Sequence, residues 1–222
     1  MPHTPHLFLA PPWGEETIEL ASDQVNHLFR ARRLSSGTRV TYTDGRGLTG
    51  SGELGPTYVA RGEERTVGPP IDLEIAVAPP HERDRIRFLV EKAAELEVRR
   101  ISWLRSRFGN ARRSLLVRAG DWARAALEQS QGAWLTVVEN DWIDPADLES
   151  GRTTVVADPA GERLGVPPPL RVVVGPEGGW AEDELPPEWP RLSLGRNILR
   201  TETAVMAATL AVSSYCTNFA GD

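Results

Sequence analysis

The sequence predicts an α/β fold with a mostly parallel sheet, preceded by a small β domain. From residue 70 onward, short apolar strand patterns alternate with helical patterns, an order typical of parallel sheets. The first seventy residues instead hold short β-like runs broken by glycine, which indicates a small barrel or sheet. The run Gly68-Pro69-Pro70 is typical of a linker. We therefore predict two domains, residues 1–69 and 70–222.

The first domain is expected to contain one short helix and then strands. Ser22 and Asp23 can cap a helix that reaches Leu34. Strand patterns follow as TRVTYTDG, LTGSGEL and TYVARGEE, at residues 38–45, 48–54 and 57–64.

The second domain alternates strands and helices along the chain. In its first helix, Ile86, Leu89, Val90 and Ala93 recur at helical spacing. The last helix is apolar almost all round, so we expect it to be buried in the domain or against a partner chain. Strands are predicted at residues 71–79, 101–104, 135–138, 153–159, 171–176 and 191–195, and helices at residues 85–96, 114–130 and 201–219.

Composition narrows the classes of function. Apolar residues make up 40% of the 222 residues, as in a folded globular protein. No apolar run reaches the roughly eighteen residues that span a membrane, and the N-terminus lacks the regions of a secretion signal. Cys216 is the only cysteine, so no internal disulfide can form and a reducing cytoplasm is the expected location. Four histidines and one cysteine give no metal-ligand spacing, and no metal is expected.

Charge is unevenly distributed along a chain whose net charge is −6. Residues 99–118 contain arginines and no acid, whereas acids gather at residues 139–158 and 177–188. Arginine binds phosphate through a planar fork of donors, so this segment favours a nucleic acid backbone as partner over a merely solvated face. The arginines are Arg99, Arg100, Arg105, Arg107, Arg112, Arg113 and Arg118.

Two glycine loops follow strands in the second domain. VVVGPEGGW at residues 172–180 carries almost no side chain, and LSLGRNILRTETA at residues 192–204 leaves a strand at Gly195. Ligands of α/β sheets bind at the carboxyl ends of strands, but a tight turn and a capped helix at Thr201 are the alternatives. A cation at Arg200 is harder to explain as capping, because it opposes the helix dipole.

Together GPEGG and LGxxILRTETA resemble the paired signatures of the RsmE family, a branch of the SPOUT methyltransferases. The likeness extends along most of the chain, through weaker matches at His27-Leu28, Arg33, Gly37 and Asp44-Gly45, at Lys92-Ala93 with Glu95-Leu96, and at Glu128-Gln129-Ser130. Four positions differ from the family pattern, mainly on the side that meets RNA: Glu97, Gln131-Gly132, Asn197, and the segment at residues 81–84.

The resemblance implies a SPOUT-type parallel sheet with a C-terminal trefoil knot, a PUA-like β-barrel before it, and a homodimer. It implies transfer of a methyl group from S-adenosylmethionine to N3 of a uridine in 16S ribosomal RNA of the small subunit. The cofactor would lie on the main chain of the two loops, which explains their lack of side chains. Its expected contacts are Val156, Gly175, Pro176, Glu177, Gly178, Gly179, Leu194, Gly195, Asn197, Ile198, Leu199, Thr203 and Ala204.

Methylation at uridine N3 requires loss of the N3 proton and stabilisation of the resulting anion. We expect Arg200 to stabilise that anion or its phosphate, and Glu202 to act either as the base or as a positioner of Arg200. RNA contacts are expected from Arg33, Arg105, Arg107, Arg112 and Arg113. A SPOUT enzyme acting on another RNA nucleotide and a non-catalytic RNA-binding protein of the same fold remain as alternatives. A small-molecule α/β enzyme ranks below both, because no nucleophile elbow or acid pair is present.

Overall fold

The computed structural model describes residues 4–109, 111–162 and 168–219. The chain divides into two compact units. The first comprises Met1–Pro69 with Leu127–Leu135, and the second comprises Pro70–Ala126 with Thr136–Asp222. The sequence did not predict that residues 127–135 belong to the first unit. Backbone hydrogen bonds hold this segment there, such as that from the Gly47 N–H to the Ala133 carbonyl, with an N–O distance of 3.0 Å.

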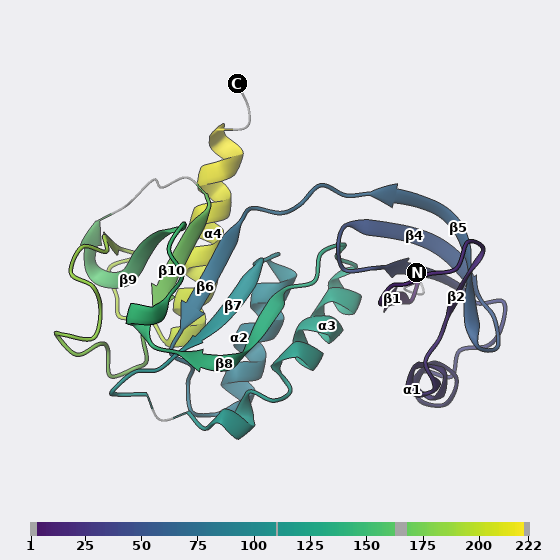
Figure 1. Ribbon diagram of the computed structural model, residues 1–222, viewed down its shortest axis with the longest axis horizontal. Coiled ribbons are helices and arrows are strands. Elements are labelled where there is room, and N and C mark those ends of the chain that lie inside the picture. The colour runs from purple at the N-terminus through teal and green to yellow at the C-terminus, as the bar shows by residue number, and fades with distance from the viewer. Residues whose placement is uncertain (1–3, 110, 163–167, 220–222) are drawn as a thin grey trace. The chain divides into compact units, whose positions relative to one another are not determined.

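The first unit contains a five-stranded sheet in the order β1-β3-β4-β5-β2. Figure 1 shows its strands in purple and blue, with β1, β2, β4 and β5 labelled. The three predicted strands are present, and β1 and β2, of three residues each, were too short to show a pattern. The predicted helix ends early, because α1 (Ser22–Asn26) continues only as a π-helical turn, His27–Ala31. The strands are β1 (His6–Phe8), β2 (Thr17–Glu19), β3 (Arg39–Thr43), β4 (Leu48–Leu54) and β5 (Tyr58–Thr66).

The second unit contains a six-stranded sheet in the order β11-β9-β10-β6-β7-β8. Every pairing in it is parallel, which confirms the predicted α/β class. Each predicted strand is present, although β8 and β9 are longer than expected. The strands are β6 (Leu73–Val77), β7 (Arg100–Leu104), β8 (Val137–Ile143), β9 (Thr153–Glu162), β10 (Leu170–Val174) and β11 (Arg191–Leu192).

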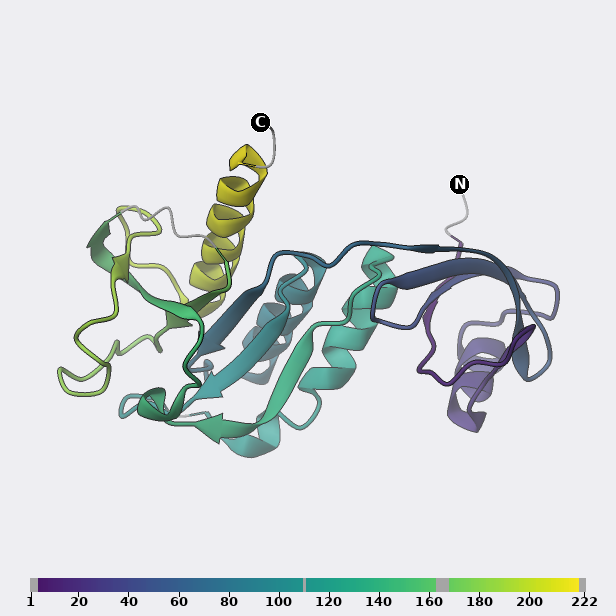
Figure 2. The same cartoon turned by 45° about the horizontal axis from the view of Figure 1, so that its top comes forward.

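Three helices accompany this sheet: α2 (Arg83–Glu95), α3 (Ala119–Ser130) and α4 (Thr201–Phe219). α3 begins later than predicted, because Arg113–Leu115 forms a separate 3₁₀ turn before it; a second such turn is Pro145–Asp147. Figure 2 shows β6, β7 and β8 side by side, with α2 against one face of the sheet. α2 and α4 pack together. None of the helices among the described residues is long and apolar enough to cross a membrane.

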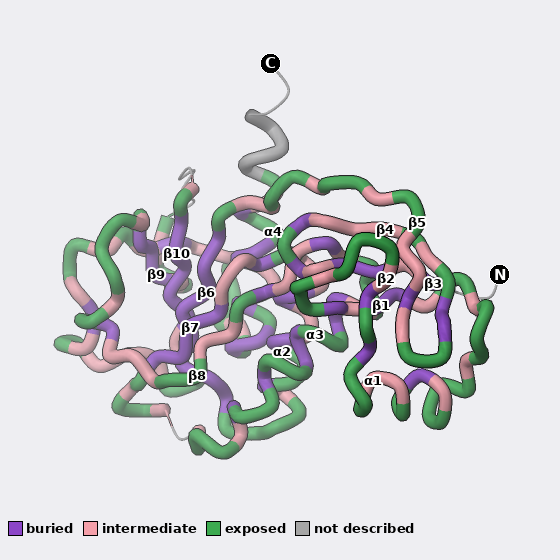
Figure 3. Tube along the Cα trace, turned by 45° about the vertical axis from the view of Figure 1, so that its right-hand side comes forward, coloured by how far each residue is buried: buried purple, intermediate pink, exposed green. Residues whose placement is uncertain are grey.

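The core of the second unit lies in its central strands, which Figure 3 shows as buried along their length. All five residues of β6 and all five of β10 are buried, as expected for strands covered on both faces. Two of these residues are charged: Glu74 and Arg171 form an ion pair with an O–N distance of 3.0 Å at 3% and 4% side-chain exposure. Ser102 donates a hydrogen bond of 2.6 Å to Glu74. The two central strands are therefore joined by a buried ion pair as well as by apolar packing, although the Arg171 Nε has no hydrogen-bond partner among the described residues.

The final helix has one buried and one open face. Val205, Ala208 and Val212 are buried, whereas Leu210 is 52% exposed. One side of α4 therefore packs into the core, and its other side is uncovered in the single chain.

Candidate functional site

The two glycine loops meet at the carboxyl ends of the parallel strands. The first leaves β10 at Val174, and the second leads from β11 into α4. Thr201 joins them, because its hydroxyl donates a hydrogen bond of 3.1 Å to the Gly175 carbonyl. The hydroxyl thus ties the start of α4 to the other loop. This edge of the sheet is where α/β proteins bind ligands.

A cavity of about 340 Å³ lies between these loops, and we call it the glycine-loop cavity. Of the residues expected to contact a cofactor, all but two line it. Val156 is instead fully buried in β9, and Thr203 is exposed in the first turn of α4. Sequence reasoning missed several lining residues, which flank the loops. The cavity is lined by Ala157, Asp158, Pro159, Val174, Gly175, Pro176, Glu177, Gly178, Gly179, Trp180, Leu194, Gly195, Asn197, Ile198, Leu199, Thr201 and Ala204.

Steric constraints explain why two positions of the first loop are glycine. A Cβ atom on Gly175 would lie 2.8 Å from the indole Nε1 of Trp180, so the ring could not keep its place. Gly179 has a φ of +73°, which side chains disfavour. The Trp180 Nε1 is buried and has no hydrogen-bond partner among the described residues. A wall of the cavity therefore contains an indole donor that the protein itself leaves unsatisfied.

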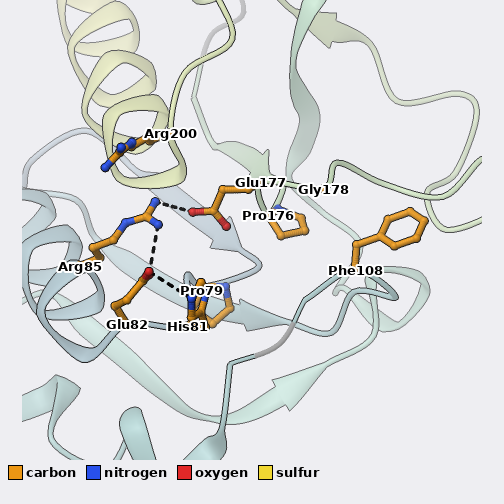
Figure 4. Close-up of a pocket in the computed structure, with 9 residues that line it drawn as sticks. All are labelled: Pro79, His81, Glu82, Arg85, Phe108, Pro176, Glu177, Gly178 and Arg200. Carbon is orange, nitrogen blue, oxygen red and sulfur yellow. Dashed lines mark hydrogen bonds and ion pairs between the residues drawn. The ribbon is translucent and has the colours of Figure 1, made fainter.

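A second cavity of about 520 Å³, which we call the charged cavity, shares Pro176, Glu177 and Gly178 with the first. Figure 4 shows its residues. Arg200, expected from the sequence, lies in it, and Arg85 of α2 was missed. Arg85 could have been predicted from the sequence, because the strand that precedes α2 ends at this edge of the sheet. The charged cavity is lined by Pro79, His81, Glu82, Arg85, Phe108, Pro176, Glu177, Gly178 and Arg200.

Arg85 is bound by three carboxylates. Its Nη2 lies 2.7 Å from an oxygen of Glu202, and its Nε lies 3.1 and 3.2 Å from the two Glu202 oxygens. Nη2 also pairs with Glu177, and Nη1 lies 3.1 Å from Glu82. The hydrogen bonds to Glu202 are the main reason that the pKa of Arg85 is raised, so the guanidinium stays charged. Arg85 thus links α2, the glycine loop and α4.

The groups around Glu202 favour its ionised form. Its side chain is 11% exposed, and burial alone would raise its pKa. The hydrogen bonds from Arg85, its own backbone N–H and the charges of Arg85 and Arg200 outweigh burial and hold the pKa of Glu202 below its usual value. The structure therefore places Glu202 as the partner of Arg85. Among the described residues, Arg200 forms no ion pair.

The arginine-rich segment is compensated by acids that are distant in sequence. Arg105 pairs with Asp144 and Arg107 with Asp183, each at 2.8 Å. Arg113 pairs with Asp141. These acids come from the two acidic stretches that the sequence showed far from the arginines. Of the other residues expected to bind RNA, Arg112 is exposed in the second unit, and Arg33 is exposed in the first with a φ of 54°.

Comparison with known proteins gives a family and a fold. A family model described as an RNA methyltransferase domain matches residues 68–213. The chain is similar to ribosomal RNA small subunit methyltransferase E from Neisseria gonorrhoeae, solved with S-adenosyl methionine, at 25% identity and a TM-score of 0.83, over 96% of this chain and 98% of that one. A probable rRNA-methyltransferase from Porphyromonas gingivalis shares the fold, at 24% identity and a TM-score of 0.77, over 97% and 99%.

A putative methyltransferase from Legionella pneumophila, solved with bound SAM, also has this fold, at 20% identity and a TM-score of 0.83, over 96% of this chain and 98% of that one. A comparison with curated proteins gives no match. Because the family model spans well over half of the chain, the protein belongs to the RNA methyltransferase domain family, that of the RsmE proteins.

Proposed function

We propose that the protein transfers the methyl group of S-adenosylmethionine to N3 of a uridine in the 16S RNA of the small ribosomal subunit. The observation that carries this proposal is the wall of residues 176–178, which the glycine-loop cavity and the charged cavity share. A cofactor in the first and a nucleotide in the second would meet across a segment with little side chain. Methyl transfer needs that proximity, since the reacting atoms must lie in line at close range.

The glycine-loop cavity fits S-adenosylmethionine in its chemistry. Ile198 and Leu199 offer apolar surface to an adenine ring, and the Trp180 indole forms part of the wall. Carboxylates of Asp158 and Glu177 also line the cavity and suit the positive charges of the ligand. When bound, the cofactor supplies a methyl group activated by a sulfonium. The chain's own contribution is to bind and orient it through exposed main chain.

The charged cavity suits a nucleotide whose base becomes anionic. Loss of the N3 proton leaves negative charge on the flanking uracil oxygens, and a preorganised cation lowers the energy of that state. Arg200 lies in the cavity with no carboxylate bound to it among the described residues, so we assign it this role. We assign Glu202 the positioning of Arg85, because its lowered pKa makes it a poor proton acceptor near neutral pH.

We extend the proposal to the finer fold and assembly. The loops around residues 175–200 are proposed to form the trefoil knot, and residues 1–69 a PUA-like RNA-binding barrel ahead of a domain at 70–222. A homodimer through α4 is supported by Leu210, which is 52% exposed on an otherwise apolar helix. Cytoplasmic location, where ribosomal subunits assemble, follows from the proposed substrate.

RNA contacts are proposed from Arg33 in the first unit, and from Arg105, Arg107, Arg112 and Arg113 in the second. The test must separate lost positive charge from broken ion pairs. Reversing the charge of Arg105 and Arg107 should weaken RNA binding and reduce its salt dependence by about one unit of slope per lost phosphate contact. The matched control is Asp144→Asn with Asp183→Asn, which breaks the same two ion pairs and keeps both arginines. Equal loss of affinity in both variants would remove these arginines from the RNA-binding surface.

The proposed function is tested by methyl transfer from labelled S-adenosylmethionine to small ribosomal subunits that lack the modification, with products mapped by nucleoside mass spectrometry. We expect 3-methyluridine at a single position. Incorporation elsewhere would assign a different RNA nucleotide. Failure to bind the cofactor would refute the assignment of the glycine-loop cavity.

A further inference from the structure

One wall of the charged cavity is an aromatic ring rather than a charge. Phe108 follows β7 in the loop that leads to the 3₁₀ turn at Arg113–Leu115, and it lines the cavity beside Gly178. Its side chain is 52% exposed. Single exposed apolar residues are common on proteins, so exposure alone does not indicate a role. The position of this one, on the wall of a cavity that also holds two arginines, does call for an explanation.

Phe108 packs against the glycine loop at residues 175–179. A Cβ atom on Gly178 would lie 2.8 Å from the Cβ atom of Phe108, so only glycine at this position lets the two backbones approach so closely. Gly178 also lines the glycine-loop cavity. Phe108 is thereby fixed next to the segment that both cavities share.

The loop that carries Phe108 is attached just before the ring and closed by a turn across it. The Arg107 N–H donates a hydrogen bond of 2.5 Å to Glu184, and the Arg107 guanidinium pairs with Asp183 at 2.8 Å. The Gly109 N–H closes a turn onto the Ser106 carbonyl at 3.1 Å. A ring presented on a loop held in this way loses little further freedom when a ligand covers it, which favours binding.

The residues of the charged cavity are arranged with charge on one side and the ring on the other. Figure 4 shows Arg85, Glu82, Glu177 and Arg200 gathered on one side of Pro176 and Gly178, and Phe108 on the opposite side. Arg200 is the cation on that side which forms no ion pair among the described residues, so the cavity offers a guanidinium and an aromatic ring. In proteins that bind single-stranded nucleic acids, cations contact the anionic groups while aromatic faces stack on bases.

We infer that Phe108 is a stacking platform for one unpaired base of the RNA that the charged cavity binds. The inference rests on the proposed function for the identity of the ligand as RNA. Stacking is tolerant of base identity because every base has a flat aromatic face. Phe108 therefore contributes affinity and placement of the strand, while the chemistry stays with the groups around the shared wall.

The test uses a fluorescently labelled RNA pentamer with one central uridine between abasic nucleotides, compared with the fully abasic pentamer. The wild-type protein should bind the uridine probe about tenfold more tightly, as expected for one stacked base. Phe108→Ala and Phe108→Leu should lose this preference, and Phe108→Tyr should keep it. The matched control is Phe88→Ala, which removes a phenylalanine that is 40% exposed on α2 and lines neither cavity.

Retention of the preference in Phe108→Ala would overturn the inference, and retention in Phe108→Leu would reduce the contact to apolar burial without stacking and overturn it as well. Absence of the preference in the wild-type protein would also overturn it. Methyl transfer to small ribosomal subunits is measured in parallel with the same variants. A wild-type protein that distinguishes the probes through Phe108 but methylates no subunit would sink the proposed function and leave the inference standing. If wild type and Phe108→Ala methylate subunits equally well, the proposed function stands and the inference is overturned.

Discussion

Replacement of Glu202 by glutamine separates two roles for this carboxylate, that of a base and that of a partner for Arg85. The amide is nearly the same size and keeps one oxygen that can accept a hydrogen bond from Arg85. It loses the negative charge and one of the two acceptors that Arg85 now uses. Any effect of Glu202→Gln therefore reports charge and pairing rather than packing.

The size of the effect follows from the burial of the pair. Hydrogen bonds to charged groups contribute about 1.5–3 kcal/mol, and the side chains of Arg85 and Glu202 are 20% and 11% exposed. Arg85 keeps its contacts with Glu177 and Glu82 in the variant, which limits the loss. We expect the free energy of unfolding to fall by about 1–2 kcal/mol. A similar weakening of the hold on Arg85 would lower kcat/KM for RNA about tenfold.

The pH dependence has a defined sign. Because the pKa of Glu202 is lower in the folded protein than its ordinary value of 4.5, its stabilising effect is present above that value and is lost as the pH falls through the folded pKa. Urea unfolding should therefore show a constant gap between wild type and Glu202→Gln from about pH 6 to 8. The gap should close in acid.

Kinetics give the decisive comparison. If Glu202 positions Arg85, the pH–rate profiles of wild type and Glu202→Gln should have the same shape, and Arg85→Gln should add little to the loss in Glu202→Gln. A loss of more than about a thousandfold in kcat, together with the disappearance of an ionisation from the profile, would identify Glu202 as the base and refute the positioning role.

Three further predictions concern the core and the loops. Arg171→Met should lower the free energy of unfolding by about 3 kcal/mol in urea titrations, because it leaves the buried Glu74 without its main ion partner; a loss below about 1 kcal/mol would contradict this. Thr201→Val removes the hydrogen bond to the Gly175 carbonyl and should cost about 1 kcal/mol, with weaker calorimetric binding of S-adenosylmethionine; unchanged cofactor affinity would show that the loops do not need this link. Glu177→Gln should weaken binding of S-adenosylmethionine more than of S-adenosylhomocysteine, which lacks the sulfonium charge, and an equal loss for both would show that the carboxylate does not act on the sulfonium.

The parts of the fold that depend on local pattern could be predicted from the sequence. The apolar runs at 171–176 and 71–79 became the central strands β10 and β6, because a strand covered on both faces must be apolar along its length. The two loops could be assigned to one site for the same reason, since each follows a strand of the same parallel sheet.

The parts that depend on strand order could not be predicted in this way. Arg85 and Glu202 are 117 positions apart, and no local pattern brings α2 beside α4. The arginine segment illustrates the same limit. Its lack of neighbouring acids suggested uncompensated charge, yet Arg105 and Arg107 meet Asp144 and Asp183 across 39 and 76 positions. Sequence reports the charge of a segment, whereas the fold decides its neighbours.

The bare loop at residues 175–179 has to serve two cavities at once, and its single carboxylate is where they interact. Glu177 lines both cavities and pairs with Arg85, which Glu202 and Glu82 also hold. A guanidinium surrounded by three carboxylates is a weak attractor for an anion. A cationic ligand in the glycine-loop cavity that engaged Glu177 would leave Arg85 with less compensating charge, and the charged cavity would then bind an anionic nucleotide more strongly. Such coupling is reciprocal, so RNA should also tighten cofactor binding, and Glu177→Gln should abolish the effect in both directions.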